Sequence, residues 1–335
     1  MIDAVARTDA EGPMITAYVP VNGALTPVPV ATGETIPTDA VWIDLLQPTD
    51  DELAFVDVKL NLDVPTEADM QEIEVSSRLY LEDDVVYMTA AMVTQADTPR
   101  PLVVPVTFVL AGHRLLTLRY AEPTPFRHYA SEARRHSVPC ATGEEVLAGL
   151  LDAIVDRVAD ILERVQSDID TLSGEVFPHE GGKTKRNYNE ILRRIGRSHA
   201  LTSQVRESLV SFGRLVSFIA RPATEKRPKA TERAFKTTAR DLTALSDHAS
   251  FIANNTSFIL NATLGLISNE QSGIIKIFSV AAVVFLPPTL IASIYGMNFE
   301  FMPELAWPWG YPMALVMMVA SAVGPYLFFK QRGWL

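Results

Sequence analysis

Residues 276–330 read KIFSVAAVVFLPPTLIASIYGMNFEFMPELAWPWGYPMALVMMVASAVGPYLFFK, and they decide the fold class. They contain 23 consecutive uncharged residues, Ile277 to Phe299, and a second run of 25, Leu305 to Phe329. A helix needs about 20 apolar residues to cross a bilayer. Both runs are too long, and lie too far along the chain, to be a signal peptide. The stretch therefore predicts a membrane protein with two C-terminal spans.

The charges beside these two runs predict their orientation. Lys276 precedes the first run, and Lys330 and Arg332 follow the second, whereas residues 298–310 carry two glutamates and no basic residue. Basic residues next to a span favour the cytoplasmic side. We therefore expect cytoplasmic termini, an external connecting loop and a location in the plasma (inner) membrane.

The chain is acidic at one end and carries no catalytic motif. Of its 335 residues, the first 100 include 19 Asp and Glu but only 4 Lys and Arg. Such a region repels nucleic acid and attracts cations. The single cysteine and six histidines without metal-ligand spacing exclude a disulfide framework and a thiolate zinc site. Because no nucleophile elbow, kinase set or dinucleotide fingerprint is present, we expect no enzyme, no catalytic cofactor and no nucleic-acid partner.

An α/β pattern precedes the long helices. Apolar or β-branched segments bounded by Gly, Pro or Asp predict five strands: Met14–Pro20, Val41–Leu45, Val85–Val93, Val103–Leu110 and Leu115–Arg119. Residues 50–60 predict a short helix. This alternation predicts a sheet with helices packed on it.

Three long helices are predicted after residue 143. The first, 144–177, has one apolar stripe with helical spacing, formed by Leu147, Leu151, Ile154, Val158, Ile161, Leu162, Val165 and Ile169. The second covers about residues 187–219. The third begins near residue 230 and continues into the first span for about 65 residues, because no proline lies between 228 and 287. So long a helix needs neighbours, from a bundle or an oligomer.

The part of this third helix that precedes the span has two interpretations. Large apolar residues such as Phe251 and Phe258 are interleaved there with Asn254 and Asn261. Small and amide residues favour close self-packing around an axis. The alternative is an ordinary two-faced helix that packs on residues 144–177.

The end of the first span carries the most informative motif. Residues 295–305 read YGMNFEFMPEL and place Asn298, Glu300 and Glu304 at a membrane mouth. Hard cations such as magnesium prefer oxygen ligands. One chain offers too few of these ligands, but a symmetric ring of chains would place several amide oxygens on one axis, as channel filters do. The alternative is a polar cap with two solvated acids.

Several motifs carry a family resemblance: YGMN at 295–298, MPEL at 302–305, KQRGWL at 330–335, LPPT at 286–289, the segment 268–285, and WIDL at 42–45. With these motifs the chain resembles the CorA magnesium transporters, part of a superfamily marked by a Gly-Met-Asn signature. The specific motifs cover about 70 C-terminal residues, and the remainder is similar in organisation and length.

The resemblance implies a homopentameric, funnel-shaped channel. Each subunit would have an α+β cytoplasmic αβα domain, a long stalk helix and two transmembrane helices. The expected parts are an acidic α/β domain (1–143), a long-helix pair (144–228), the stalk helix (229–273), the pore-lining first span (274–298), an external loop (299–310), the second span (311–329) and a basic cytoplasmic tail (330–335). The expected partners are divalent cations, membrane lipid and further copies of the chain.

The resemblance also implies roles for residues of the first span and the loop. Gly296, Met297 and Asn298 would form the external selectivity filter, which holds magnesium through its water shell. Glu300 and Glu304 would concentrate cations at the mouth. The residues implied to line the pore share one helical face: Ile275, Phe278, Ala282, Leu286, Thr289 and Ser293. Leu286 would be a hydrophobic constriction; the alternative is a leucine that faces lipid or another helix.

Magnesium is expected to be both the transported and the regulatory ion. In the family, cytosolic magnesium bound between acidic domains holds the channel shut. Asp241 on the stalk is one candidate ligand. The acidic cluster Glu82, Asp83 and Asp84 is another, for which the alternative is a charged turn before the strand at 85–93.

Three functions remain open at this point. The first is gated magnesium influx, with cobalt and nickel as further candidate ions. The second is zinc transport of the ZntB type, although Met297 and the MPEL loop favour the first. The third is a membrane-anchored metal sensor or scaffold that transports nothing, for which Asn298 would be dispensable.

Overall fold

The structure is a computed structural model that describes residues 15–72, 74–135, 138–178, 187–220, 228–297 and 302–333. The chain divides into two compact units, Met1–Ile259 and Leu260–Leu335. Each unit is considered below by itself.

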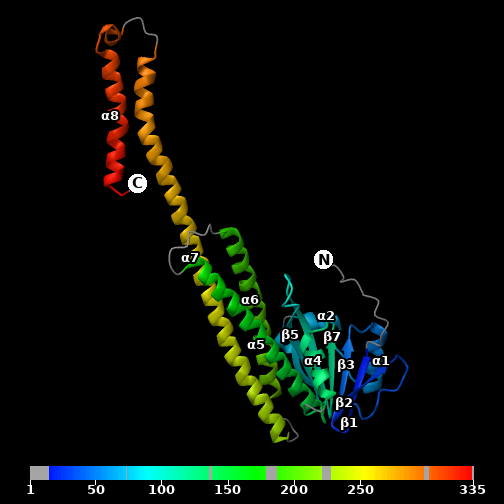
Figure 1. The fold of residues 1–335 in the computed structure, drawn as a ribbon. Helices are drawn as coiled ribbons and strands as arrows, with labels where there is room; N and C mark the ends of the chain where they lie inside the picture. The colour runs from blue at the N-terminus through cyan, green and yellow to red at the C-terminus, as the bar shows by residue number, and fades with distance from the viewer. Residues whose placement is uncertain are drawn as a thin grey trace. The chain divides into compact units, whose positions relative to one another are not determined.

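A seven-stranded mixed sheet forms the centre of the first unit, with strand order β2-β1-β3-β7-β6-β5-β4 (Figure 1). Neighbouring strands are antiparallel except β3 and β7, which run parallel with Asp44 opposite Thr117. The strands are β1 (Ile15–Val21), β2 (Ala24–Val30), β3 (Trp42–Leu46), β4 (Leu79–Glu82), β5 (Val85–Thr94), β6 (Leu102–Ala111) and β7 (Arg114–Arg119).

The five predicted strands are confirmed as β1, β3, β5, β6 and β7, and the two strands that the sequence did not predict are the sheet edges. β2 contains Pro27 and Pro29, which lower strand propensity but are tolerated at an edge because proline donates no ladder hydrogen bond. β4 has only four residues, too few to show a period of two.

Helices cover both faces of the sheet, which confirms the predicted αβα arrangement. Ile43 of β3 belongs to one core cluster with Val56 of α1 and Met70 of α2. Its neighbour Trp42 points to the other face and meets Tyr129 of α4 edge-on, with ring centroids 5.8 Å apart. The helices of this unit before α7 are α1 (Asp50–Leu60), α2 (Glu67–Gln71), α3 (Val75–Arg78), α4 (Thr124–Ala133), α5 (Gly143–Val176) and α6 (Tyr188–Ile219).

Two long helices, α5 and α6, pack against each other and on the sheet face that α4 also covers. Their bounds agree with the predicted helices at 144–177 and 187–219. All eight residues of the predicted apolar stripe of α5 are buried. The burial of that stripe explains why α5 is stable over 34 residues.

The helix α7 (Lys229–Tyr295) is continuous over 67 residues, as predicted, and belongs in part to each unit. It continues through Pro287 and Pro288. A short 3-10 helix, η1 (Pro303–Ala306), and α8 (Gly310–Gln331) follow it. Both α7 and α8 contain segments long and apolar enough to cross a membrane.

In the first unit α7 has two different faces. One face is buried, with Leu242, Ala249 and Ile252 at most 3% exposed. The ring of Phe258 stacks on Phe177, the residue that follows α5, with centroids 6.0 Å apart. The other side of α7 carries both Phe251 and Phe258, which are 57% and 60% exposed. The two-faced interpretation therefore accounts for one side of α7 and leaves the opposite side uncovered.

Candidate ion path and regulatory sites

The predicted selectivity filter follows the C-terminal end of α7. Asn298 and Glu300 lie outside the described residues. Just before them, the Gly296 N–H donates to the Ala292 carbonyl at 2.9 Å, so the chain leaves α7 through a helical turn that ends at the half-exposed Met297. The C-terminal end of a helix carries partial negative charge. A cation placed beyond this end would therefore be stabilised.

A close backbone contact positions Glu304 in the loop between α7 and α8. Glu304 is exposed in η1, and its carbonyl oxygen lies only 2.1 Å from the point that a Cβ on Gly310 would occupy. The Gly310 N–H donates to the Trp307 carbonyl at 2.9 Å. Glycine at the start of α8 thus lets η1 approach closely, and this contact fixes the backbone of Glu304.

The six residues predicted to line the pore are all exposed in the single chain: Ile275, Phe278, Ala282, Leu286, Thr289 and Ser293. Ile275, Phe278 and Leu286 are 64–71% exposed, whereas Val280 of α7 and Ala314 of α8 are buried. The Thr289 hydroxyl donates to the Phe285 carbonyl at 2.7 Å. The predicted face is therefore open to lipid, water or another copy.

The predicted acidic cluster is the turn that joins β4 to β5. Glu82 pairs with Val85, and Asp83 and Asp84 between them have φ angles of 46° and 63°. Two consecutive residues with positive φ form the tight turn that suits the twist of a hairpin. All three acidic residues are exposed. In a single chain they thus have the geometry of the charged turn that was the alternative interpretation.

Asp241 lies on α7 near Asp152 of α5, a carboxylate that the sequence analysis did not single out. Burial raises the pKa of Asp152, and the nearby carboxylates of Asp156 and Asp241 raise it further. The i,i+4 spacing of Asp152 and Asp156 was the available signal. Within the described residues no three His, Cys, Asp or Glu side chains are placed to hold a metal ion together. A metal site at Asp241 therefore needs ligands from beyond this set.

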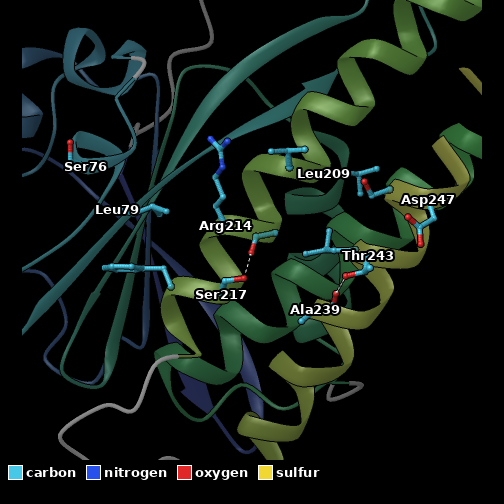
Figure 2. A pocket seen from close by; sticks show the side chains of 13 residues that line it. Ser76, Leu79, Leu209, Arg214, Ser217, Ala239, Thr243 and Asp247 are labelled. Atoms are coloured by element: carbon cyan, nitrogen blue, oxygen red, sulfur yellow. Dashed lines mark hydrogen bonds between the residues drawn. The ribbon is translucent and has the colours of Figure 1, made fainter. Parts of the chain in front are cut away.

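A groove of about 620 Å³ separates α6 and α7 near the start of β4 (Figure 2). Arg214 of α6 and Asp247 of α7 are the charged residues that line it, together with hydroxyl groups such as those of Ser217 and Thr243. Among the described residues neither Arg214 nor Asp247 forms an ion pair. The groove thus lies between α7, which carries Asp241, and β4, which ends at Glu82; these residues belong to the two predicted regulatory sites.

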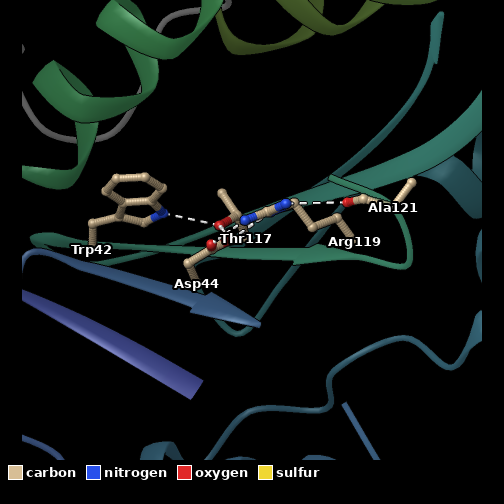
Figure 3. Close-up of polar contacts among 5 residues, drawn as sticks. All are labelled: Trp42, Asp44, Thr117, Arg119 and Ala121. Atoms are coloured by element: carbon tan, nitrogen blue, oxygen red, sulfur yellow. Dashed lines mark hydrogen bonds and ion pairs between the residues drawn. The ribbon is translucent and has the colours of Figure 1, made fainter. Parts of the chain in front are cut away.

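A buried polar network joins the central strands β3 and β7 (Figure 3). Asp44 accepts hydrogen bonds from the Thr117 hydroxyl at 2.7 Å and from Nη2 of Arg119 at 2.7 Å. The Trp42 indole donates to Thr117 at 2.9 Å, and Arg119 also donates to the Ala121 carbonyl at 3.1 Å. The WIDL segment thus supplies a buried ion pair for the sheet and no group to the ion path.

Comparison with known proteins identifies the family. Residues 38–331 match the family described as CorA-like Mg2+ transporter protein. The magnesium transport protein CorA of Escherichia coli (strain K12) is 35% identical over 323 residues, which cover 96% of this chain and all of that protein. The complete structure of the CorA magnesium transporter from Methanocaldococcus jannaschii matches with a TM-score of 0.74 at 18% identity, over 96% of this chain and 99% of that one.

The chain belongs to the CorA-like Mg2+ transporter family. The expectation of a transporter rather than an enzyme is confirmed by this membership. The cytoplasmic domain of ZntB from Vibrio parahaemolyticus also matches, with a TM-score of 0.58 at 10% identity, over 77% of this chain and 99% of that one. At that identity the likeness shows a shared fold and carries no information on the ion.

Proposed function

We propose that the chain is the subunit of a homopentameric channel for magnesium influx across the plasma (inner) membrane, with both termini cytoplasmic. Cobalt and nickel are further ions that such a channel would pass. The observation that carries the proposal is α7, a single helix that ends at the Gly-Met-Asn motif and exposes all six predicted pore residues.

The filter is proposed to be a ring of Asn298 residues with Gly296 and Met297 behind it. Five amide oxygens would contact the water shell of magnesium, an ion that gives up its waters reluctantly. Five helix C-termini would add their partial negative charge at the same place. Glu300 and Glu304 would raise the local cation concentration at the mouth.

The membrane potential is proposed as the driving force. Moving one elementary charge across 100 mV is worth about 2.3 kcal/mol, so a divalent ion gains about 4.6 kcal/mol. This gain needs no nucleotide hydrolysis. It also means that the channel requires a brake when the cell is full.

The proposed brake is cytosolic magnesium bound between acidic domains of neighbouring subunits. The first 100 residues carry 19 acidic and only 4 basic side chains, so five such domains repel one another unless cations bridge them. Asp241 and the turn Glu82–Asp84 are the proposed ligands. Because magnesium would bind the closed ring better than the open one, its loss shifts the equilibrium toward opening.

The test is magnesium uptake into proteoliposomes at an inside-negative potential, with and without internal magnesium. Asn298→Ala is expected to abolish uptake, whereas Asn269→Ala, a matched change on an exposed position of α7, is expected to leave it intact. Internal magnesium is expected to suppress uptake by the parent. Uptake of zinc alone would replace the proposal with a ZntB-type function, and a folded oligomer without any flux would indicate a sensor or scaffold.

A further inference from the structure

Trp307 joins the 3-10 helix η1 to α8 through backbone hydrogen bonds in both directions. Its N–H donates to the Glu304 carbonyl at 3.3 Å, and its own carbonyl accepts from the Gly310 N–H at 2.9 Å. The carbonyl of Trp309 accepts from the Met313 N–H at 3.0 Å in the first turn of α8. A displacement of either tryptophan would therefore move the backbone of Glu304, which also lies in close contact with Gly310.

The side chains at this link are aromatic and exposed. Trp307, Trp309 and Tyr311 are 52%, 67% and 75% exposed in the single chain. Large rings that remain in bulk water gain nothing from the hydrophobic effect. Tryptophan and tyrosine are enriched where a membrane meets water, because their rings are apolar at one end and polar at the other. The composition of the link therefore favours contact with the headgroup layer of a bilayer.

One exposed face of α8 extends from Trp309 to the opposite end of the helix. Its members follow one another at alternating distances of three and four residues, and all are exposed: Trp309, Pro312, Val316, Val319, Val323, Tyr326 and Lys330. Ala314 is buried and lies two positions before Val316, which places it about 160° away on the helix. The exposed face is thus opposite the covered side of α8.

The length and composition of this face match a bilayer. From Trp309 to Lys330 the helix rises about 32 Å, and the hydrocarbon core of a bilayer is about 30 Å thick. The lysine can extend its charge to the headgroups while its stem stays in the apolar layer. Helix contacts within membranes favour small residues, and this face contains no Gly, Ala, Ser or Thr. The face is therefore suited to lipid rather than to another helix.

We propose that Trp307 and Trp309 anchor the loop between α7 and α8 in the lipid headgroup layer, and that this anchor positions Glu304 relative to the mouth of the ion path. The proposal rests on the proposed channel function, in which Glu304 concentrates cations at the mouth. A carboxylate does so only close to the path, because salt screens its field over about 8 Å at physiological ionic strength. The two tryptophans are positioning residues that contact lipid and act on the ion through Glu304.

The first experiment measures lipid contact and does not depend on transport. Full-length protein is placed in phosphatidylcholine vesicles whose acyl chains carry bromine, a contact quencher of tryptophan emission, either near the headgroups or near the bilayer centre. Trp334→Phe removes the C-terminal tryptophan, and Trp42, which is buried in the first unit, serves as the internal reference.

Bromine near the headgroups is expected to quench the emission of Trp307 and Trp309 more strongly than bromine near the centre. Replacing both tryptophans by phenylalanine in the same background should abolish this quenching. Stronger quenching from the bilayer centre would overturn the proposal. Absence of quenching from either depth would also overturn it, because the rings would then contact protein or water.

The second experiment measures the consequence for the ion. Magnesium uptake into proteoliposomes is followed against external magnesium for Trp307→Leu, Trp309→Leu and the double variant. Leucine is apolar but lacks the amphipathic ring, so the half-maximal concentration should rise severalfold in the double variant while the maximal rate stays near that of the parent. Trp309→Tyr should retain the parent value. So should Leu315→Ala, a change at an exposed position of α8 outside the tryptophan face.

A fall in maximal rate without a change in the half-maximal concentration would indicate a structural role and overturn the positioning of Glu304. In a Glu304→Gln background the leucine variants should have no further effect, because they act through that carboxylate; an additive effect would contradict the inference. A parent that carries no magnesium would refute the channel function and with it the role of Glu304, whereas the quenching experiment would still decide the lipid contact.

Discussion

Replacing Asp44 by alanine is expected to destabilise the sheet-containing unit strongly. Asp44 and Arg119 are only 7% exposed at their side chains, and the carboxylate accepts bonds from both Nε and Nη2 of the guanidinium, at 3.0 and 2.7 Å. The carboxylate also accepts a hydrogen bond from the Thr117 hydroxyl at 2.7 Å. Without the carboxylate, the Arg119 charge stays buried with one carbonyl acceptor, that of Ala121, and the Phe126 ring at 4.9 Å.

The expected magnitude follows from that geometry. Removing one partner of a buried ion pair costs about 3–5 kcal/mol, because the remaining charge is desolvated and unpaired. Since 1 kcal/mol shifts the midpoint by about 2–4 °C in a unit of this size, the thermal midpoint should fall by about 6–20 °C. Asp44→Asn keeps an acceptor for Thr117 and should cost less, about 1–3 kcal/mol.

The assay is thermal unfolding of the full-length protein in detergent, followed by tryptophan fluorescence. Trp42 is the only tryptophan before residue 307, and its indole donates to Thr117 in this network, so its emission reports on the unit. The matched control is Asp97→Ala, which breaks ion pairs of a carboxylate that is 57% exposed and should cost about 1 kcal/mol or less. If Asp44→Ala costs no more than Asp97→Ala, the attribution of stability to the buried pair is refuted.

Three further predictions concern acid stability, the loop between α7 and α8, and α5. Hydrogen bonds from Arg164 and Arg157 lower the pKa of Asp97, so the stability that this ionised carboxylate adds to the folded protein is present above pH 4 and is lost as the pH falls through the lowered pKa. In acid titrations of the thermal midpoint, Asp97→Asn should remove this pH-dependent loss, which amounts to about 1 kcal/mol at most. Gly310→Ala would place a Cβ 2.1 Å from the Glu304 carbonyl and should raise the external magnesium concentration needed for half-maximal uptake, whereas Gly324→Ala, with open space around it, should not. Asp152→Asn should raise the thermal midpoint at pH 7, because burial and nearby carboxylates disfavour the ionised form; a lower midpoint would show that Asp152 has a favourable partner.

Elements that depend on local pattern could be predicted from the sequence, and elements that depend on distant partners could not. The apolar stripe of α5 follows from spacing, and the continuity of α7 as far as residue 286 follows from the absence of proline between 228 and 287. β2 does not, because Pro27 and Pro29 argue against a strand and only its edge position makes them acceptable. The pairing of Asp44 with Arg119, 75 residues away, depends on parallel pairing of β3 with β7, which no local period encodes.

The residues of the candidate site could be predicted from the sequence only in part, for different reasons. The roles of Asn298 and Glu300 came from the resemblance, and both residues lie outside the described residues. Asp241 was singled out, but its neighbour Asp152 was not, because their proximity depends on how α7 packs beside α5. The acidic turn at residues 82–84 could be placed in sequence, yet its two positive φ angles are explained by the hairpin alone.

The exposed pore residues and the scattered carboxylates explain why one chain does not complete the proposed ion path or its metal sites. In the described residues, the predicted pore face is exposed, and no three His, Cys, Asp or Glu side chains are placed to hold a metal ion. Exposed apolar side chains such as Phe278 and Leu286 gain nothing from burial within a single chain. In the proposed assembly several copies would share an axis, so that the predicted pore faces would line a path and single carboxylates would become parts of shared sites. The folded unit is therefore encoded within the chain, whereas the proposed ion path would be a property of the assembly.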